Sequence, residues 1–251
     1  MRLWLALLPL LCPLLLMAKP FELTTAVQRD SAPKYLVQDE QLPARGLCVD
    51  ILHAIEQLDP ELHMVISAKP LPLTRLERSV QTGELSLLCG VGDTLSRRQQ
   101  FHFIEPPLFS VRYQMAVRRD DPVSVAHWQE VRALGKEGII LVNRGSGPVE
   151  RLRSLGGLEV DDGGQTTASN LGKLLSGRGR FFYYRSPGLH DELERLKLTE
   201  RVRILPAVFE HHFFYLLATR GIPPIVLTRL RLAVQQLASD GTLDSLSARY
   251  N

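Results

Sequence analysis

Between residues 21 and 91, short apolar runs alternate with amphipathic stretches of helical period. Three runs have the length and apolar content of strands: residues 21–27, 63–68 and 85–91. Two stretches between them have one apolar helical face: residues 50–58 and 73–82. We expect Asp50 to be the N-cap of the first helix and Gly83 to end the second. This β-α-β-α-β order predicts a parallel sheet covered by helices.

The rest of the chain repeats the alternation. Further strands are predicted at residues 111–118, 138–142, 181–184, 204–207 and 213–218. Further helices are predicted at residues 149–154, 167–176, 190–196, 228–238 and 243–250. Two successive α/β halves predict two lobes with a cleft between them, and such sheets bind ligands at the carboxyl ends of their strands.

The N-terminus resembles a secretory signal peptide. Arg2 precedes an uncharged apolar stretch from residue 3 to 17, and we expect cleavage after Ala18. A retained membrane anchor is disfavoured because the stretch is shorter than a spanning helix and contains two prolines. Lipidation at Cys12 is disfavoured because the residue before it, Leu11, stands where a lipoprotein signal needs a small residue. The mature chain is therefore expected outside the cytoplasm.

Charge and motif content exclude several classes of function. The formal net charge is +3, and the 30 basic and 27 acidic side chains are scattered, so we expect no nucleic-acid partner. No His and Cys spacing fits a metal site, and no phosphate-binding loop or nucleophile motif occurs. We therefore expect no metal and no cofactor.

Two cysteines, Cys48 and Cys89, remain after the predicted cleavage. In an oxidising compartment such a pair can form a disulfide. Cys89 lies in an apolar, strand-like run, however, and buried cysteine behaves as a small hydrophobe. That position favours two free thiols over a bridge.

Several stretches resemble the motifs of one family. They are GLCVD at 46–50, GELSLLCG at 83–90, TLSR at 94–97, FIEP at 103–106, VNRGSG at 142–147, and LASDGTL at 237–243 with a tyrosine at 250. Their order and spacing are similar to those of bacterial periplasmic solute-binding proteins of family 3, the amino-acid-binding class. The resemblance runs over nearly all of residues 20–251.

The resemblance implies an α/β protein with the two-lobed type 2 periplasmic-binding fold, in which helices flank a mainly parallel sheet in each lobe and two strands form a hinge. We expect lobe 1 to comprise residues 19–112 and 207–251, and lobe 2 residues 113–206, with crossovers near 110–113 and 207–214. The resemblance further implies a monomer that captures a small polar solute without changing it chemically. The protein would deliver the solute to an ABC transporter permease or report it to a membrane receptor.

Arg97 is the first candidate binding residue. The resemblance implies that it grips a ligand carboxylate, with Thr94 nearby, a task that suits the guanidinium fork. Gly145, Ser146 and Gly147 lie between a predicted strand and helix, where backbone N–H groups and the helix dipole favour an anion. The alternatives are an exposed loop arginine and an ordinary turn with Ser146 as N-cap.

Other positions depart from the family pattern. Ser86 stands where the family has an acidic residue, and Arg180 and Arg185 follow the stretch in which amino-acid binders tend to read G-R-x-D-A. Tyr35 lies where the family often places an aromatic against the ligand. The predicted site therefore has no acidic partner for the α-amino group of an amino acid. A dianion or another acidic solute would suit Arg97, Arg185 and the glycine loop better.

Two alternative functions stay open at this stage. A periplasmic enzyme on the same fold, similar to a dehydratase, would need an acidic or basic group in the cleft; the candidates are Glu105, Glu210, His211 and His212. The two adjacent histidines point to opposite faces of a strand, which is more typical of structural residues. The second alternative is a sensory binding module.

Overall fold

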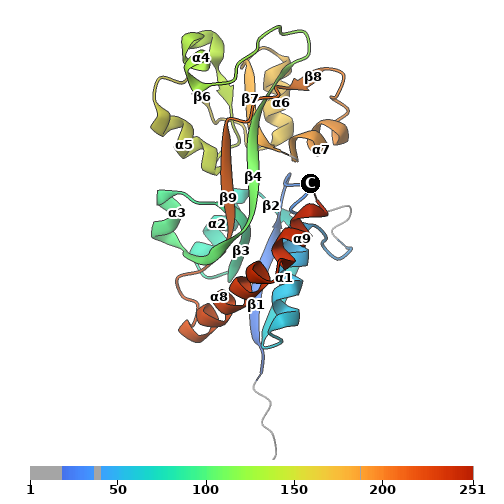
Figure 1. The fold of residues 1–251 in the computed structure, drawn as a ribbon, viewed down its shortest axis with the longest axis vertical. Coiled ribbons are helices and arrows are strands. Elements are labelled where there is room, and N and C mark those ends of the chain that lie inside the picture. Colours follow the sequence, from blue (N-terminus) through green and yellow to red (C-terminus); the bar gives the residue numbers. More distant parts are fainter. Residues whose placement is uncertain (1–18, 37–40, 187, 251) are drawn as a thin grey trace, which may run out of the picture.

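The computed structural model describes residues 19–36, 41–186 and 188–250. The predicted signal peptide, residues 1–18, lies outside the described residues. Within the described ranges, no helix is long and apolar enough to cross a membrane. The elements form two groups, one above the other in Figure 1, and two strands run between them.

We call the lower group in Figure 1 lobe 1. It contains β1 (Phe21–Gln28), α1 (Leu47–Leu58), β2 (Leu62–Leu71), α2 (Leu73–Gln81), β3 (Leu87–Gly92), α3 (Leu95–Gln100), α8 (Pro224–Ser239) and α9 (Thr242–Ala248). The predicted strand–helix alternation of the first 91 residues is therefore confirmed. The C-terminal helices α8 and α9 return to this lobe and pack on α1.

The upper group is lobe 2. It contains α4 (Trp128–Ala133), a 3-10 turn (Gly135–Gly138), β5 (Ile140–Leu141), α5 (Gly147–Leu155), β6 (Val160–Asp161), α6 (Thr167–Leu175), β7 (Phe181–Ser186), α7 (Gly188–Arg195) and β8 (Val202–Ile204). One set of apolar side chains from β7, α6 and α7 forms a core under these helices.

Two long strands connect the lobes: β4 (His102–Arg118) and β9 (Glu210–Ala218). They pair antiparallel, with Ser110 opposite Phe213 and Tyr113 opposite Glu210. Both predicted crossovers therefore lie side by side in one ribbon, which is the two-strand connection implied by the resemblance. The predicted boundary positions within it stay predictions.

Strand direction differs from the simplest expectation. β1 pairs parallel with β2, and β5 pairs parallel with β6 and β7. β3, however, pairs antiparallel with β9, and β4 pairs antiparallel with β7, β8 and β9. The uninterrupted parallel sheet predicted from residues 21–91 is therefore wrong at β3, because its ladder partner comes from the distant return segment.

Helix α1 begins earlier than predicted. Its N-cap is Gly46, not Asp50, and the N–H groups of Leu47 and Cys48 donate to the carbonyls of Pro33 (3.1 Å) and Lys34 (3.0 Å). Carbonyls from a distant loop thus satisfy the first-turn donors that we expected a side chain to cap. This contact fixes the backbone of residues 33–34 against the helix.

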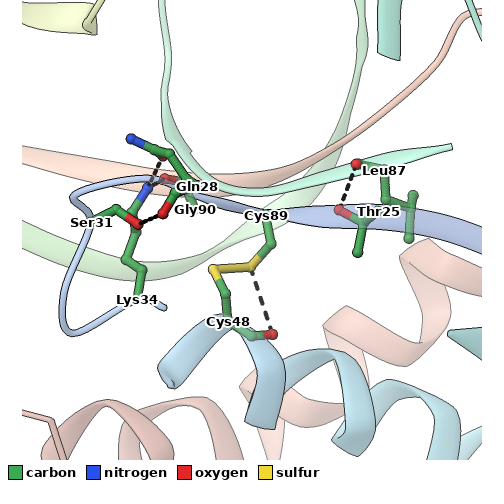
Figure 2. Close-up of a disulfide and its surroundings, with 8 residues drawn as sticks. All are labelled: Thr25, Gln28, Ser31, Lys34, Cys48, Leu87, Cys89 and Gly90. Carbon is green, nitrogen blue, oxygen red and sulfur yellow. Dashed lines mark hydrogen bonds between the residues drawn. A yellow bond between two sulfur atoms is a disulfide. The ribbon is translucent and has the colours of Figure 1, made fainter. Parts of the chain in front are cut away.

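Cys48 on α1 and Cys89 on β3 form a disulfide between fully buried residues (Figure 2), so the expectation of two free thiols is wrong. Their Cα atoms lie 5.9 Å apart, within the usual range for a bridge. Burial of Cys89 in an apolar strand did not argue against pairing, because Cys48 in the first turn of α1 is buried beside it.

Replacing both cysteines by alanine is expected to lower the free energy of unfolding by about 4 kcal/mol, because the bridge closes a loop with a sequence separation of 41. Urea unfolding of the oxidised protein and of the Cys48→Ala, Cys89→Ala double variant measures the difference. A change below about 1 kcal/mol would show that the bridge contributes little to the fold.

Candidate functional site

A cavity of about 320 Å³ lies between the lobes and is lined by both of them. Tyr113 from β4 and His212 and Phe214 from β9 belong to its wall. Six basic side chains line it: Arg29, Lys34, Arg97, Arg144, Arg151 and Arg185. Of these, Lys34, Arg97 and Arg185 are buried, with exposed fractions of 4%, 5% and 6%.

Most residues predicted for the site line this cavity: Thr94, Arg97, Ser146, Gly147 and Arg185. Gly145 adjoins it through its carbonyl, which accepts a hydrogen bond from Arg97. Tyr35 is not among the lining residues; its ring is buried in the core of lobe 1 instead. The binding role of each residue stays a prediction.

Arg97 is committed to protein partners on several sides. Its Nε donates to Glu77 Oε1 (2.7 Å), its Nη1 to the Gly92 carbonyl (2.9 Å) and its Nη2 to the Gly145 carbonyl (3.0 Å). The guanidinium therefore bridges the lobes, and Glu77 offsets its charge. A guanidinium has five N–H groups, so Arg97 still has donors left for a solute.

The N-terminus of α5 offers fewer backbone donors than predicted. Ser146 occupies the N-cap position, but its hydroxyl donates to the Asn143 carbonyl (2.6 Å) and does not cap the helix. The Ser146 N–H also donates to Asn143, and Pro148 has no N–H. A Cβ at Gly147 would lie 3.2 Å from Arg97 Nη1, so glycine lets this turn approach the arginine closely.

Lys34 is a lining residue that our sequence analysis missed. Its Nζ donates to Gln28 Oε1 (2.6 Å) and to the Gly90 carbonyl (2.7 Å), as Figure 2 shows, and lies 5.4 Å from the centre of the Phe214 ring. Gly90 has φ +74°, and a Cβ there would lie 2.8 Å from Lys34 Cδ. Glycine thus lets the lysine stem reach its carbonyl partner.

Burial holds the pKa of Lys34 well below its ordinary value of 10.5, and the charges of Arg185 and Arg97 lower it further. The same two arginines affect Tyr113, whose pKa is nonetheless raised by burial. Lys34, Arg97, Arg185 and Tyr113 all line the cavity.

Arg185 comes from the end of β7 in lobe 2. Its Nη2 donates to the Ala32 carbonyl (2.8 Å), and its guanidinium lies 4.6 Å from the centre of the Tyr184 ring. Among the described residues, neither Arg185 nor Lys34 forms an ion pair with a carboxylate. The Arg185 charge lowers the pKa of Asp191 slightly, but burial raises that pKa more. The neutral partners of Lys34 and Arg185 would not compensate a positive charge on either side chain.

Three carboxylates also line the cavity, those of Asp30, Asp93 and Glu150, and the sequence analysis named none of them as a partner for an α-amino group. Asp93 pairs with Arg98, and Glu150 accepts from the Leu95 N–H (3.2 Å). Asp30 has a longer contact of 3.7 Å to Arg195. Asp30 is therefore the lining carboxylate least committed to the protein.

The remaining candidates have structural partners. Arg180 pairs with buried Asp121 through two bonds of 2.9 Å, away from the cavity lining. Glu105 is an exposed partner of Arg98. Glu210 accepts from Arg151 (2.7 Å) and lies 2.8 Å from His212 Nε2. Exposed His211 lies on the opposite face of β9 from His212, as predicted for adjacent strand residues.

Contacts on both sides of the cavity join the lobes. On one side, Arg97 reaches Gly145 and the Leu95 N–H reaches Glu150. On the other, the Tyr184 hydroxyl donates to the Asp30 carbonyl (2.9 Å), beside the bond from Arg185 to Ala32. The lobes are thus held close together. In the described ranges, no group of three or more acidic, His or Cys side chains could hold a metal ion.

The sequence profile of one family, the bacterial extracellular solute-binding proteins, family 3, matches residues 23–251. No curated protein matches the chain.

Solved structures with the same fold are similar at low sequence identity. A histidine kinase sensor domain with similarity to periplasmic binding proteins has a TM-score of 0.77 and 17% identity, over 92% of this chain and 96% of that one. An ancestral arginine-binding protein bound to arginine has a TM-score of 0.74 and 17% identity, over 93% of this chain and 99% of that one. A third similar structure is AbpA from Streptococcus pneumoniae, an amino acid ABC transporter substrate-binding protein bound to L-arginine. Its TM-score is 0.72 at 19% identity, over 90% of this chain and 92% of that one.

Substituting Lys34 by methionine is expected to make the free energy of unfolding less dependent on pH, because a buried amine with a lowered pKa is removed. The unfolded chain holds the Lys34 proton up to pH 10.5, whereas the folded chain releases it at lower pH. The stability of the native protein should therefore rise with pH between those two pKa values.

Urea unfolding of both proteins across that pH window measures the effect. The free energy of unfolding of the Lys34→Met variant, minus that of the native protein, should fall as the pH rises. Lys69→Met, at an exposed position, is the matched control and should follow the native protein. A constant difference at every pH would contradict the lowered pKa.

Proposed function

Since the chain belongs to the bacterial extracellular solute-binding proteins, family 3, we propose that it captures a small anionic solute between its two lobes and releases it unchanged. The lining of the cavity supports an anion. Its buried cations come from both lobes, so one bound anion would contact lobe 1 through Lys34 and lobe 2 through Arg185.

The single observation that carries this proposal is the burial of Lys34 and Arg185 on neutral carbonyl and amide oxygens. Removing a charge from water costs several kcal/mol unless an opposite charge compensates it. A carboxylate or similar group of the solute would supply that charge and would form charge-assisted hydrogen bonds with both residues. Anion binding is thereby favoured at this position over a neutral polar solute.

Binding would stabilise the closed arrangement of the lobes. The strands β4 and β9 carry the chain between them, and a solute that bridges Lys34 and Arg185 adds contacts available only when the lobes are close. Arg97 already contributes one bridge through Gly145, so its role in the proposal is to hold α5 against the cavity and to add positive charge.

An amino acid is the second candidate solute. Asp30 lines the cavity and has only a 3.7 Å contact to Arg195, so its carboxylate could pair with an α-amino group. The arginine-bound relatives bind such a zwitterion. We favour the anion because the buried cations outnumber the carboxylates that lack a close partner.

We further propose a periplasmic location and a membrane partner. The N-terminal sequence has the layout of a cleaved signal peptide, and members with this fold include both substrate-binding proteins of ABC transporters and a sensor domain of a histidine kinase. Delivery to a permease and reporting to a receptor both use the closed form, and no chemical step on the solute is needed for either.

A thermal-shift screen of residues 19–251, followed by calorimetric titration, tests the solute class. Dicarboxylates, monocarboxylates, sulfate, phosphate and the standard amino acids are compared at equal concentration. We expect the acidic solutes to raise the unfolding temperature and the neutral and basic amino acids to leave it unchanged. Tight binding of a neutral or basic amino acid, or no response to any anion, would overturn the proposal.

Arg185→Gln is expected to weaken binding of the best anion from this screen by about 10- to 100-fold, because a charge-assisted hydrogen bond is lost. Arg178→Gln is the control, since Arg178 is exposed and lies outside the cavity lining. Calorimetry gives both dissociation constants. Equal affinities of the Arg185→Gln variant and the native protein would exclude Arg185 from the site.

A further inference from the structure

The hydrogen bonds of Lys34 suit a neutral amine. A neutral amine has two N–H groups, and Lys34 has two strong acceptors, Gln28 Oε1 at 2.6 Å and the Gly90 carbonyl at 2.7 Å (Figure 2). An ammonium has three N–H groups. Beyond these two acceptors the described residues provide the Phe214 ring, 5.4 Å away, as a weak substitute.

No carboxylate among the described residues forms an ion pair with Lys34 or contributes to its lowered pKa. Arg97 on α3 and Arg185 on β7 act on its charge, Tyr113 on β4 lines the same cavity, and Tyr250 and Lys34 line a smaller neighbouring one. Burial raises the pKa of both tyrosines, so they are neutral below pH 10.

The cavity between the lobes is also lined by other charged or titratable side chains: Arg29, Asp30, Asp93, Arg144, Glu150, Arg151, Tyr183, Tyr184 and His212. The Asp30 carboxylate lies 3.7 Å from Arg195. The lining carboxylates Asp93 and Glu150 have their own partners.

The position of Lys34 is fixed by the fold, so the amine cannot swing out to water without breaking several contacts. Its carbonyl accepts from the Cys48 N–H, and the disulfide joins Cys48 to Cys89, next to the Gly90 carbonyl that holds Nζ. The backbone of Lys34 and the tip of its side chain are therefore anchored to the same buried junction of α1 and β3.

We propose that Lys34 selects the charge of the solute: the side chain is a neutral amine before binding and becomes an ammonium when a doubly negative solute enters, so that one proton is taken up with the ligand. This inference rests on the proposed function. A second negative charge is required because Arg97 and Arg185 are permanently charged, and Glu77 offsets only Arg97.

The balance of the step is simple. The proton comes from the solvent, adds to the Lys34 amine, and the new N–H donates to an oxygen of the anion. Of the three buried basic side chains of the cavity, only lysine can gain a proton in this way, since arginine keeps its proton at all accessible pH values. The affinity for a dianion should therefore fall as the pH rises above the pKa of the unliganded amine, by up to tenfold per pH unit.

Calorimetric titration of residues 19–251 with sulfate and with succinate tests this directly, because both probes keep two negative charges between pH 7 and 10. Titration in Tris and in triethanolamine, whose ionisation enthalpies differ, gives the number of protons taken up. We expect an uptake that approaches one proton per anion within this pH range, and none in Lys34→Arg or Lys34→Met. Lys69→Met, on the surface, should keep the native uptake.

The outcomes separate the two claims. Binding without proton uptake at any pH, or uptake that persists in both Lys34 variants, overturns the role of Lys34 and leaves the proposed function standing. Failure of both probes and of every anion of the screen to bind overturns the proposed function, and with it this inference. Thermal unfolding of each variant shows whether it is folded before titration.

Discussion

In the proposed function, two basic side chains that are buried without an ionic partner, Lys34 and Arg185, select an anion as the solute. Burial of a charge on neutral oxygens costs stability, and the neighbouring guanidinium of Arg97 adds repulsion. Surface residues would relieve such strain by exposure to solvent. Here both side chains line a cavity between the two lobes, so an anion that enters it would compensate the charge of Arg185 and that of the protonated form of Lys34.

The local fold explains how a flexible lysine is kept in this position. The loop after β1 caps the first turn of α1 with its carbonyls, and the disulfide fastens the same turn to β3. At Gly90 the backbone adopts a positive φ that opens a carbonyl toward the lysine tip. The start of α1, the disulfide and the positive φ at Gly90 together fix the position of the Lys34 side chain.

The sequence predicted local elements well and non-local partners poorly. Runs such as residues 85–91 carry their own strand pattern, whereas the antiparallel partner of β3 lies more than 120 residues away. Asp50 was expected to cap α1 because it is a good N-cap residue by local sequence. The carbonyls of residues 33–34 accept from the first-turn N–H groups instead, and no local pattern indicates that contact. The same reason explains Lys34: nothing in its neighbourhood along the chain indicates that Gln28 and Gly90 enclose its amine. The resemblance to the family brought Arg97 into view, but not its commitment to Glu77.

The central claim is that buried cations of both lobes hold one anion. A crystal structure of residues 19–251 soaked with selenate, with anomalous scattering to locate selenium, tests it most directly. The account predicts a selenate between the lobes with oxygens within hydrogen-bond distance of Lys34 Nζ and of the Arg185 guanidinium. Selenium found only outside the cavity, with Lys34 and Arg185 in contact with protein groups alone, would contradict it.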